Sequence, residues 1–191
     1  MEFEMVSLQH LVNIAGAALE CRDRFMLGCT LQNPHLYEHP SGVLLFDREW
    51  YNEAVIFESL LSSFPFRVRT QVNVGSHPFD LALYATSKER SPEAYGEIEG
   101  WWSEEGEGEI DEISKNIGLL RQAPSNSAFL IILTNSPPKQ AQENIVWLQQ
   151  RLKMPTGSAT QPYTFLTQHP SCSVPDHGYT TEFAIFGVLV K

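Results

Sequence analysis

Three acidic side chains within otherwise apolar runs are the residues of this sequence best suited to chemistry. Asp80 lies in the run 79–84, and Glu97 and Glu99 lie in the run 94–102. Alternate residues of a strand point to the same face of a sheet, so Glu97 and Glu99 share a face, and Asp80 joins them if its strand is the neighbour. Carboxylates at such short distances repel each other unless a proton, solvent or a cation lies between them. Because oxygen ligands suit Mg²⁺ or Mn²⁺, the pattern predicts a divalent metal site.

A solvated surface is the other interpretation of the Glu-Ile-Glu pattern at residues 97–99. In a sheet with one face in water, alternate residues are polar for that reason alone. The spacing of the acids is the same in both cases, so both interpretations stay open at this stage.

The strands that must position these acids follow from the hydrophobic pattern. The runs 79–84 and 94–102 flank the polar loop 86–93, which is typical of a β-hairpin with a longer connection. Residues 67–74 alternate polar and apolar side chains, which predicts a half-buried strand. The continuous apolar run 128–133 predicts a strand covered on both faces.

Further elements complete an α/β pattern. We expect helices over 1–20, 47–62, 110–122 and 139–153, and closing strands over 163–166 and 182–190. Between the first two helices we predict a connection over 21–41, with a short strand at 26–31, and then a short strand or the start of the next helix at 42–46. This mixture predicts a mixed central sheet flanked by helices.

One acid on a predicted helix is also a candidate. Glu53 lies between Trp50 and Phe57 on the apolar stripe of the helix 47–62. A glutamate at a core-facing edge is unusual unless its carboxylate pairs with a charged group. The alternative is a side chain that extends to solvent along the apolar surface.

Length and composition fit a single domain. Its 191 residues divide into an N-terminal helix and extension (1–46), a core (47–135), and a C-terminal helix and strands (136–191). No apolar run approaches the ~18 residues of a membrane span, and the acidic start is unlike a secretory signal. Three widely spread cysteines predict no disulfide framework and a cytoplasmic location.

The net charge of −10 is concentrated in one acidic zone, residues 93–112. This zone contains nine acidic residues and no Lys or Arg, so it accounts for nearly all of the net charge. A non-specific polyanion binder is usually basic, which counts against unaided binding of DNA or RNA. Metal ions that neutralise the zone would remove that objection. Alternatively, the zone binds a protein partner or simply solvates the surface.

The order of these elements resembles that of the PD-(D/E)xK nucleases, which have the restriction-endonuclease-like fold. The resemblance covers about residues 47–133: helix, strand, Asp strand, Glu-x-Lys-type strand, helix and buried strand. It implies that Asp80 and Glu97 bind the metal, that Glu53 completes the metal site, and that Lys115, on the following helix, faces phosphate. Gly100 and Trp101 are similar to the small and aromatic residues that often follow the family motif.

Two features depart from the family pattern. Phe79 separates Pro78 from Asp80, so the Pro-Asp pair is broken, and Glu99 stands where the family usually has its lysine. That lysine is thought to help position the attacking water and to stabilise charge on the phosphate. Some enzymes of this fold use Glu at that place, with a second metal or as a base, and Lys115 is another source of the missing charge.

The resemblance therefore implies two alternative functions. The first is a Mg²⁺- or Mn²⁺-dependent nuclease, in which Asp80, Glu97, Glu99 and Lys115 are catalytic, and Glu53 also contributes to metal binding. Its chemistry would be attack by a metal-activated water on a phosphodiester. The second is a non-catalytic protein on the same fold that binds a protein partner through its acidic zone. Oligomeric state is not readable from the sequence.

Overall fold

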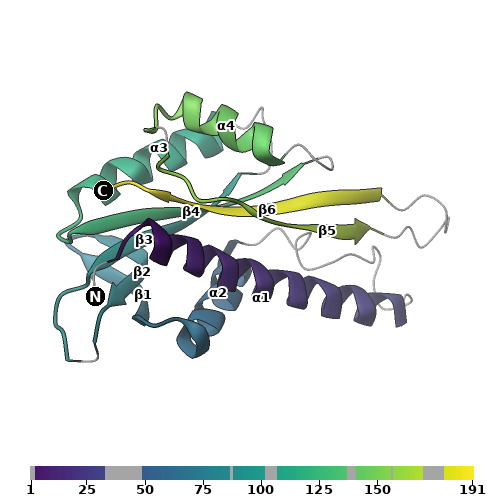
Figure 1. Cartoon of the computed structure of the whole chain (residues 1–191), viewed down its shortest axis with the longest axis horizontal. Helices are drawn as coiled ribbons and strands as arrows, with labels where there is room; N and C mark the ends of the chain where they lie inside the picture. The colour runs from purple at the N-terminus through teal and green to yellow at the C-terminus, as the bar shows by residue number, and fades with distance from the viewer. Residues whose placement is uncertain are drawn as a thin grey trace.

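A computed structural model describes residues 3–32, 49–86, 88–101, 107–136, 141–155, 157–169 and 179–191 (Figure 1). Four helices and six strands lie within these ranges. The helices are α1 (Met5–Gln32), α2 (Glu49–Ser63), α3 (Glu107–Gln122) and α4 (Ala141–Arg151). The strands are β1 (Arg67–Val74), β2 (His77–Tyr84), β3 (Ala94–Trp101), β4 (Ser127–Ser136), β5 (Tyr163–His169) and β6 (Tyr179–Leu189).

The six strands form one mixed sheet in the order β1-β2-β3-β4-β6-β5. β3 and β4 are parallel, with Glu97 opposite Leu130 and Glu99 opposite Ile132. Every other neighbouring pair is antiparallel. The predicted hairpin is confirmed, because β2 and β3 are antiparallel with Leu81 opposite Gly96. A helix, α3, connects the two parallel strands, as such a crossover requires.

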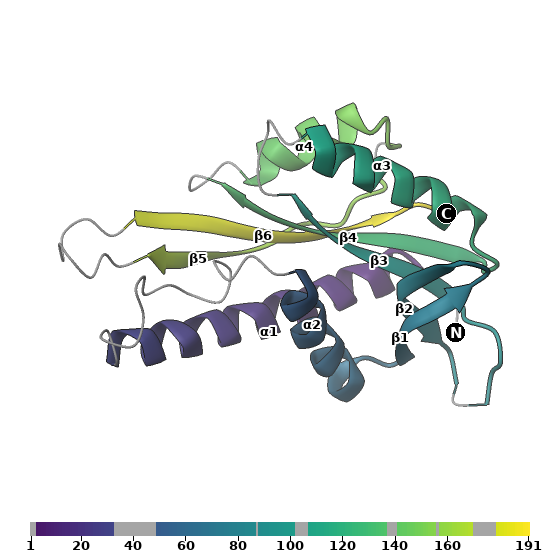
Figure 2. The same ribbon diagram turned by 180° about the vertical axis from the view of Figure 1, so that it is seen from behind.

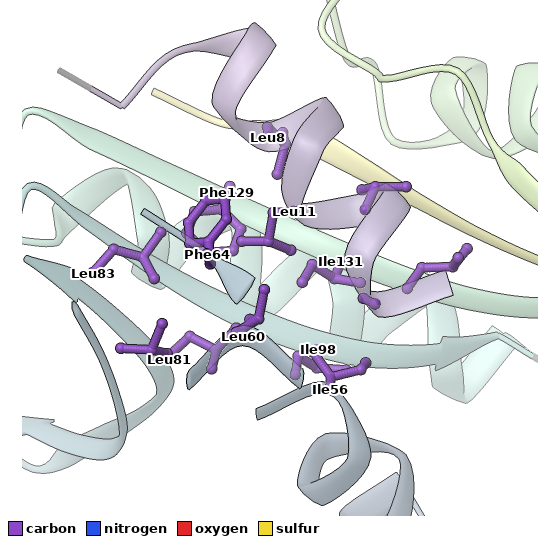
Figure 3. Packing of buried hydrophobic residues seen from close by; sticks show 14 of the residues in the cluster. Leu8, Leu11, Ile56, Leu60, Phe64, Leu81, Leu83, Ile98, Phe129 and Ile131 are labelled. Atoms are coloured by element: carbon purple, nitrogen blue, oxygen red, sulfur yellow. The ribbon is translucent and has the colours of Figure 1, made fainter. Parts of the chain in front are cut away.

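Helices cover both faces of the sheet (Figures 1 and 2). On one face, α1 and α2 pack against a core that contains Leu8, Leu11, Ile56, Leu60, Phe64, Leu81, Leu83, Ile98, Phe129 and Ile131 (Figure 3). On the other face, α3 and α4 pack against residues that include Phe79, Tyr95, Trp101, Leu130 and Ile132. β4 is thus buried on both faces, which confirms the interpretation of its continuous apolar run.

A close approach of β4 to β3 occurs beside the predicted acids. The Phe129 ring lies over Gly96, where any added Cβ would overlap its carbon atoms. Glycine therefore lets the aromatic ring pack directly on the backbone of β3. This contact fixes the strand immediately before Glu97.

The prediction of a connection with a short strand at 26–31 is wrong, because α1 continues to Gln32. Its second half is held by contacts with a strand distant in sequence. The Tyr163 hydroxyl on β5 donates to Glu20 (2.5 Å), and the Thr167 hydroxyl donates to the buried carboxylate of Asp23 (3.0 Å). Arg24 also pairs with Glu20 one turn along the helix. These tertiary contacts stabilise the longer helix. The sequence of residues 26–31 does not indicate them.

The other predicted elements occur within a few residues of their expected bounds. The alternatives for residues 42–46 lie outside the described residues. Within the ranges that the structure describes, no helix combines the length and apolar character needed to cross a bilayer.

Candidate functional site

The candidate site lies where β2 and β3 stop pairing as a regular ladder. The last paired residues are Leu81 and Gly96. Beyond them, the Asp80 side chain takes the place of a backbone acceptor, since its Oδ2 accepts from the Ile98 amide at 3.0 Å. The Asp80 amide in turn donates to Glu97 Oε2 at 3.4 Å. The two predicted acids therefore lie against each other at the point where the strands diverge.

The edge strand β1 is irregular beside this divergence. Gln71 has a left-handed φ of 51° and lies opposite Asp80, between the pairs Thr70–Leu81 and Val72–Phe79, and the register is the same on both sides of it. Left-handed residues other than glycine are uncommon and cluster at functional sites. The Gln71 side-chain amide donates to Asp80 Oδ1 at 3.1 Å, so both oxygens of that carboxylate are hydrogen-bonded.

Glu97 and Glu99 are buried, with only 3% and 7% of their surfaces exposed. They lie on the α3 face of the sheet with Tyr95 and Trp101, whereas Ile98 points into the core under α1 and α2. The prediction that the two acids share a face is confirmed. The solvated-surface interpretation is wrong for this pair, because the face that carries them is covered.

Burial changes the protonation of Glu97. Loss of hydration, followed by the hydrogen bond and negative charge of Asp80 and the charge of Glu99, raises the pKa of Glu97 to about 10. A buried carboxylate beside another carboxylate is costly to ionise. At neutral pH and without a cation, Glu97 therefore keeps its proton. Perturbed carboxyl groups of this kind are frequent at functional sites.

Two polar residues complete the surroundings of the acids. His77, at the start of β2, places Nε2 2.6 Å from Glu97 Oε1. Asn116, on α3, donates from its side-chain amide to Glu99 Oε1. A histidine after a turn and an asparagine within a helix carry no local signal of such contacts. Neither residue belongs to the predicted site, because only the strand divergence and the helix packing bring them here.

The other predicted site residues lie elsewhere. Glu53 is half-buried on α2, and this helix packs on the face opposite Glu97 and Glu99. Lys115 is exposed on α3, opposite the stripe of Ile113, Ile117 and Leu120 that packs on the sheet. The structure therefore places Asp80 against Glu97, with Glu99 on the same face as Glu97, but it does not bring the full predicted set together. The roles of Glu53 in metal binding and of Lys115 toward phosphate stay predictions.

The acidic zone is not one continuous acidic surface. Two of its members, Glu97 and Glu99, are buried in the protein, whereas Asp111 and Glu112 are exposed on α3. Trp101 is buried and its ring stacks on that of Trp147, with centroids 5.5 Å apart, so it packs within the protein. Trp102 and residues 103–106 lie outside the described residues.

The donor chemistry of the site fits a divalent cation, although the donors do not converge on one point. Carboxyl and imidazole groups are the ligands that such ions take in proteins. His77, Glu97 and Asp80 form a row with Glu97 in the middle. Among the side chains that the structure describes, no three His, Cys, Asp or Glu residues are already arranged as a metal site.

Comparison with protein-family models, with curated proteins and with solved structures finds no match to this chain.

Proposed function

We propose that this chain is a divalent-metal-dependent phosphodiesterase of the restriction-endonuclease-like type that acts on nucleic acid. The observation that carries the proposal is the contact between Asp80 and Glu97 where β2 and β3 diverge, with Glu99 two residues further along the same face. A buried acid in contact with a second acid destabilises a fold unless a proton or cation compensates the charge. Their placement is therefore better explained by ligand binding than by stability.

The order of elements supports the proposal. The chain runs α2, β1, β2, β3, α3 and β4, with the first three strands antiparallel and β3 parallel to β4. This is the helix, three strands, helix and buried strand on which the resemblance to PD-(D/E)xK nucleases rests. Asp80 lies on the second of these strands, and Glu97 and Glu99 lie on the third.

Each residue of the site has a distinct part in the proposal. The carboxyl groups of Asp80 and Glu97 hold the cation, and Asn116 orients Glu99 through its hydrogen bond. Glu53 and Lys115 are given no part in the proposal, because α2 packs on the opposite face of the sheet and Lys115 is exposed on the side of α3 away from the sheet. When bound, Mg²⁺ or Mn²⁺ lowers the pKa of a bound water and stabilises charge on the phosphate.

A second candidate is a non-catalytic protein on this fold. The observation that favours it is the position of Glu99, which occupies the usual place of lysine and accepts a hydrogen bond from a neutral amide. The nearest lysine along α3, Lys115, is turned to solvent. A site without a lysine at this place lacks one source of positive charge for the phosphate.

Metal binding and cleavage, measured with matched variants, test the proposal. Calorimetry with Mn²⁺ is combined with cleavage assays on single- and double-stranded DNA and RNA in Mg²⁺ and in Mn²⁺. We expect the wild type to bind Mn²⁺ and to cleave at least one substrate. Asp80→Asn and Glu97→Gln should abolish binding and lower the cleavage rate by about 10² or more.

The control is Asp111→Asn, which removes an exposed acid from α3 and should change neither result. Mn²⁺ binding that survives both Asp80→Asn and Glu97→Gln would place the metal elsewhere and end the proposal. Binding at this site without cleavage of any substrate would favour the non-catalytic candidate.

A further inference from the structure

His77 is a polar side chain directed at the carboxyl groups from outside the predicted ligand set. Gly75, with a φ of 64°, forms the turn between β1 and β2, and His77 is the first residue of β2, paired with Val74. Its ring packs edge-on against Phe79, with centroids 4.8 Å apart and planes at 82°. The turn and this aromatic contact fix the ring so that Nε2 reaches Glu97 Oε1.

These two atoms are near enough to become ligands of one ion after a small separation. Two ligand atoms that are each about 2.1 Å from an ion and at right angles lie about 3.0 Å apart. The His77 Nε2 and Glu97 Oε1 atoms are 2.6 Å apart and form a hydrogen bond, so an ion that binds both would move them slightly apart. The remaining surface of His77 is accessible, since 29% of its side chain is exposed, whereas 4% of the Glu97 side chain is. An ion could therefore reach this pair from the side of the imidazole.

We propose that His77 is a nitrogen ligand of the cation held by Asp80 and Glu97, and that the site therefore selects first-row transition-metal ions such as Mn²⁺, Co²⁺ or Zn²⁺ over Mg²⁺. This inference rests on the proposed metal site but does not require that the site be catalytic.

The selectivity follows from the ligand types. Mg²⁺ takes oxygen ligands, demands near-ideal octahedral geometry and gives up its waters reluctantly. Imidazole nitrogen suits transition metals, whose affinity for such sites rises from Mn²⁺ through Co²⁺. Replacing one oxygen ligand by imidazole thus weakens Mg²⁺ binding relative to the other ions.

Pulsed electron paramagnetic resonance of the full chain loaded with Mn²⁺ tests the ligand directly. We expect modulation from a coordinated ¹⁴N nucleus in the wild type and its loss in His77→Gln, which keeps a polar side chain but removes the ring. Competition titrations should show that Mg²⁺ displaces Mn²⁺ poorly from the wild type. His77→Gln should lower the Mn²⁺ affinity by about tenfold or more, as loss of groups around metal sites commonly does.

His10→Gln is the matched control, because His10 is exposed on α1 and packs against Phe64 in the layer on the other face of the sheet. It should retain the ¹⁴N signal. If His77→Gln fails to fold, wild type with ¹⁵N-labelled histidine should still show the nitrogen signal change from ¹⁴N to ¹⁵N. Mn²⁺ bound through Asp80 and Glu97 without a nitrogen signal would overturn the role of His77 and leave the proposed function standing. Absence of Mn²⁺ binding in the wild type would overturn both.

Discussion

At the scale of single residues, the contact between Asp80 and Glu97 satisfies a backbone amide but places two acids side by side. Asp80 satisfies the Ile98 amide, which has lost a regular ladder partner at the divergence. Glu97 is then left beside an acid in a buried place, where it retains a proton. The same two residues thus close the gap between the strands and raise the pKa of Glu97.

Glu97 should make folding stability depend on pH. Its pKa is raised from 4.5 to about 10 in the folded protein, so between these values the folded state holds a proton that the unfolded state releases. The stability from this group is complete below about pH 4.5, and it falls as pH rises toward 10. We expect urea unfolding in the presence of a chelator to show this decline, and Glu97→Gln to reduce it. Identical pH profiles for the two proteins would contradict the buried, protonated state of Glu97.

Strand alternation was enough to predict that Glu97 and Glu99 share a face, and hairpin pairing was enough to predict that Asp80 lies beside Glu97. The burial of Glu97 and Glu99 was not predictable, because it depends on α3 packing across that face. His77 and Asn116 were missed for a related reason. Their contacts join residues 20 and 17 positions apart in sequence, through the irregular end of a hairpin and the packing of α3 on the sheet.

At the scale of elements, α1 shows how a strand distant in sequence determines the length of a helix. Gly16 lies against the Tyr163 ring of β5, and an added Cβ there would overlap ring atoms. The Tyr163 hydroxyl is bonded to Glu20 one turn further on, which holds the ring in place. The helix is therefore joined to β5 along its length, and this contact explains why it continues beyond residue 20.

Two glycines of α1 provide a matched test of this docking. Gly16→Ala should lower the free energy of unfolding by about 1–3 kcal/mol, because overpacking outweighs the gain in helix propensity. Gly28→Ala has nothing within 4 Å of the added carbon and should raise it by up to about 1 kcal/mol. Chemical denaturation of both variants measures these changes. Destabilisation by Gly28→Ala would contradict the helical extension over 21–32.

At the scale of the whole molecule, the sheet has a simple plan that the sequence indicated only in part. Alternating apolar runs predicted strands buried on one face, and the continuous apolar run predicted a strand buried on both faces. The order of strands in the second half was not predictable from those runs. β6 lies between β4 and β5, so the strand that comes last in sequence is internal.

Removal of β6 should therefore disrupt the whole fold rather than one edge. A chain that ends at residue 178 leaves β4 with one neighbour and β5 without any, and it uncovers residues of α1. We expect this chain to lose cooperative thermal unfolding, measured by circular dichroism, and addition of a peptide of residues 179–191 to restore part of it. A sharp transition in the shortened chain alone would show that β6 is dispensable.

The internal position of β6 also has a consequence during synthesis on the ribosome. The apolar stripe of α1, which includes Leu8, Leu11, Val12, Ala15 and Leu19, forms first but packs against β5 and β6, which emerge last. At typical translation rates the interval between them is on the order of ten seconds. During this time the nascent chain exposes a surface that chaperones bind and that aggregates readily. Production of this protein should therefore be more sensitive to chaperone supply and translation speed than the stability of its finished fold would indicate.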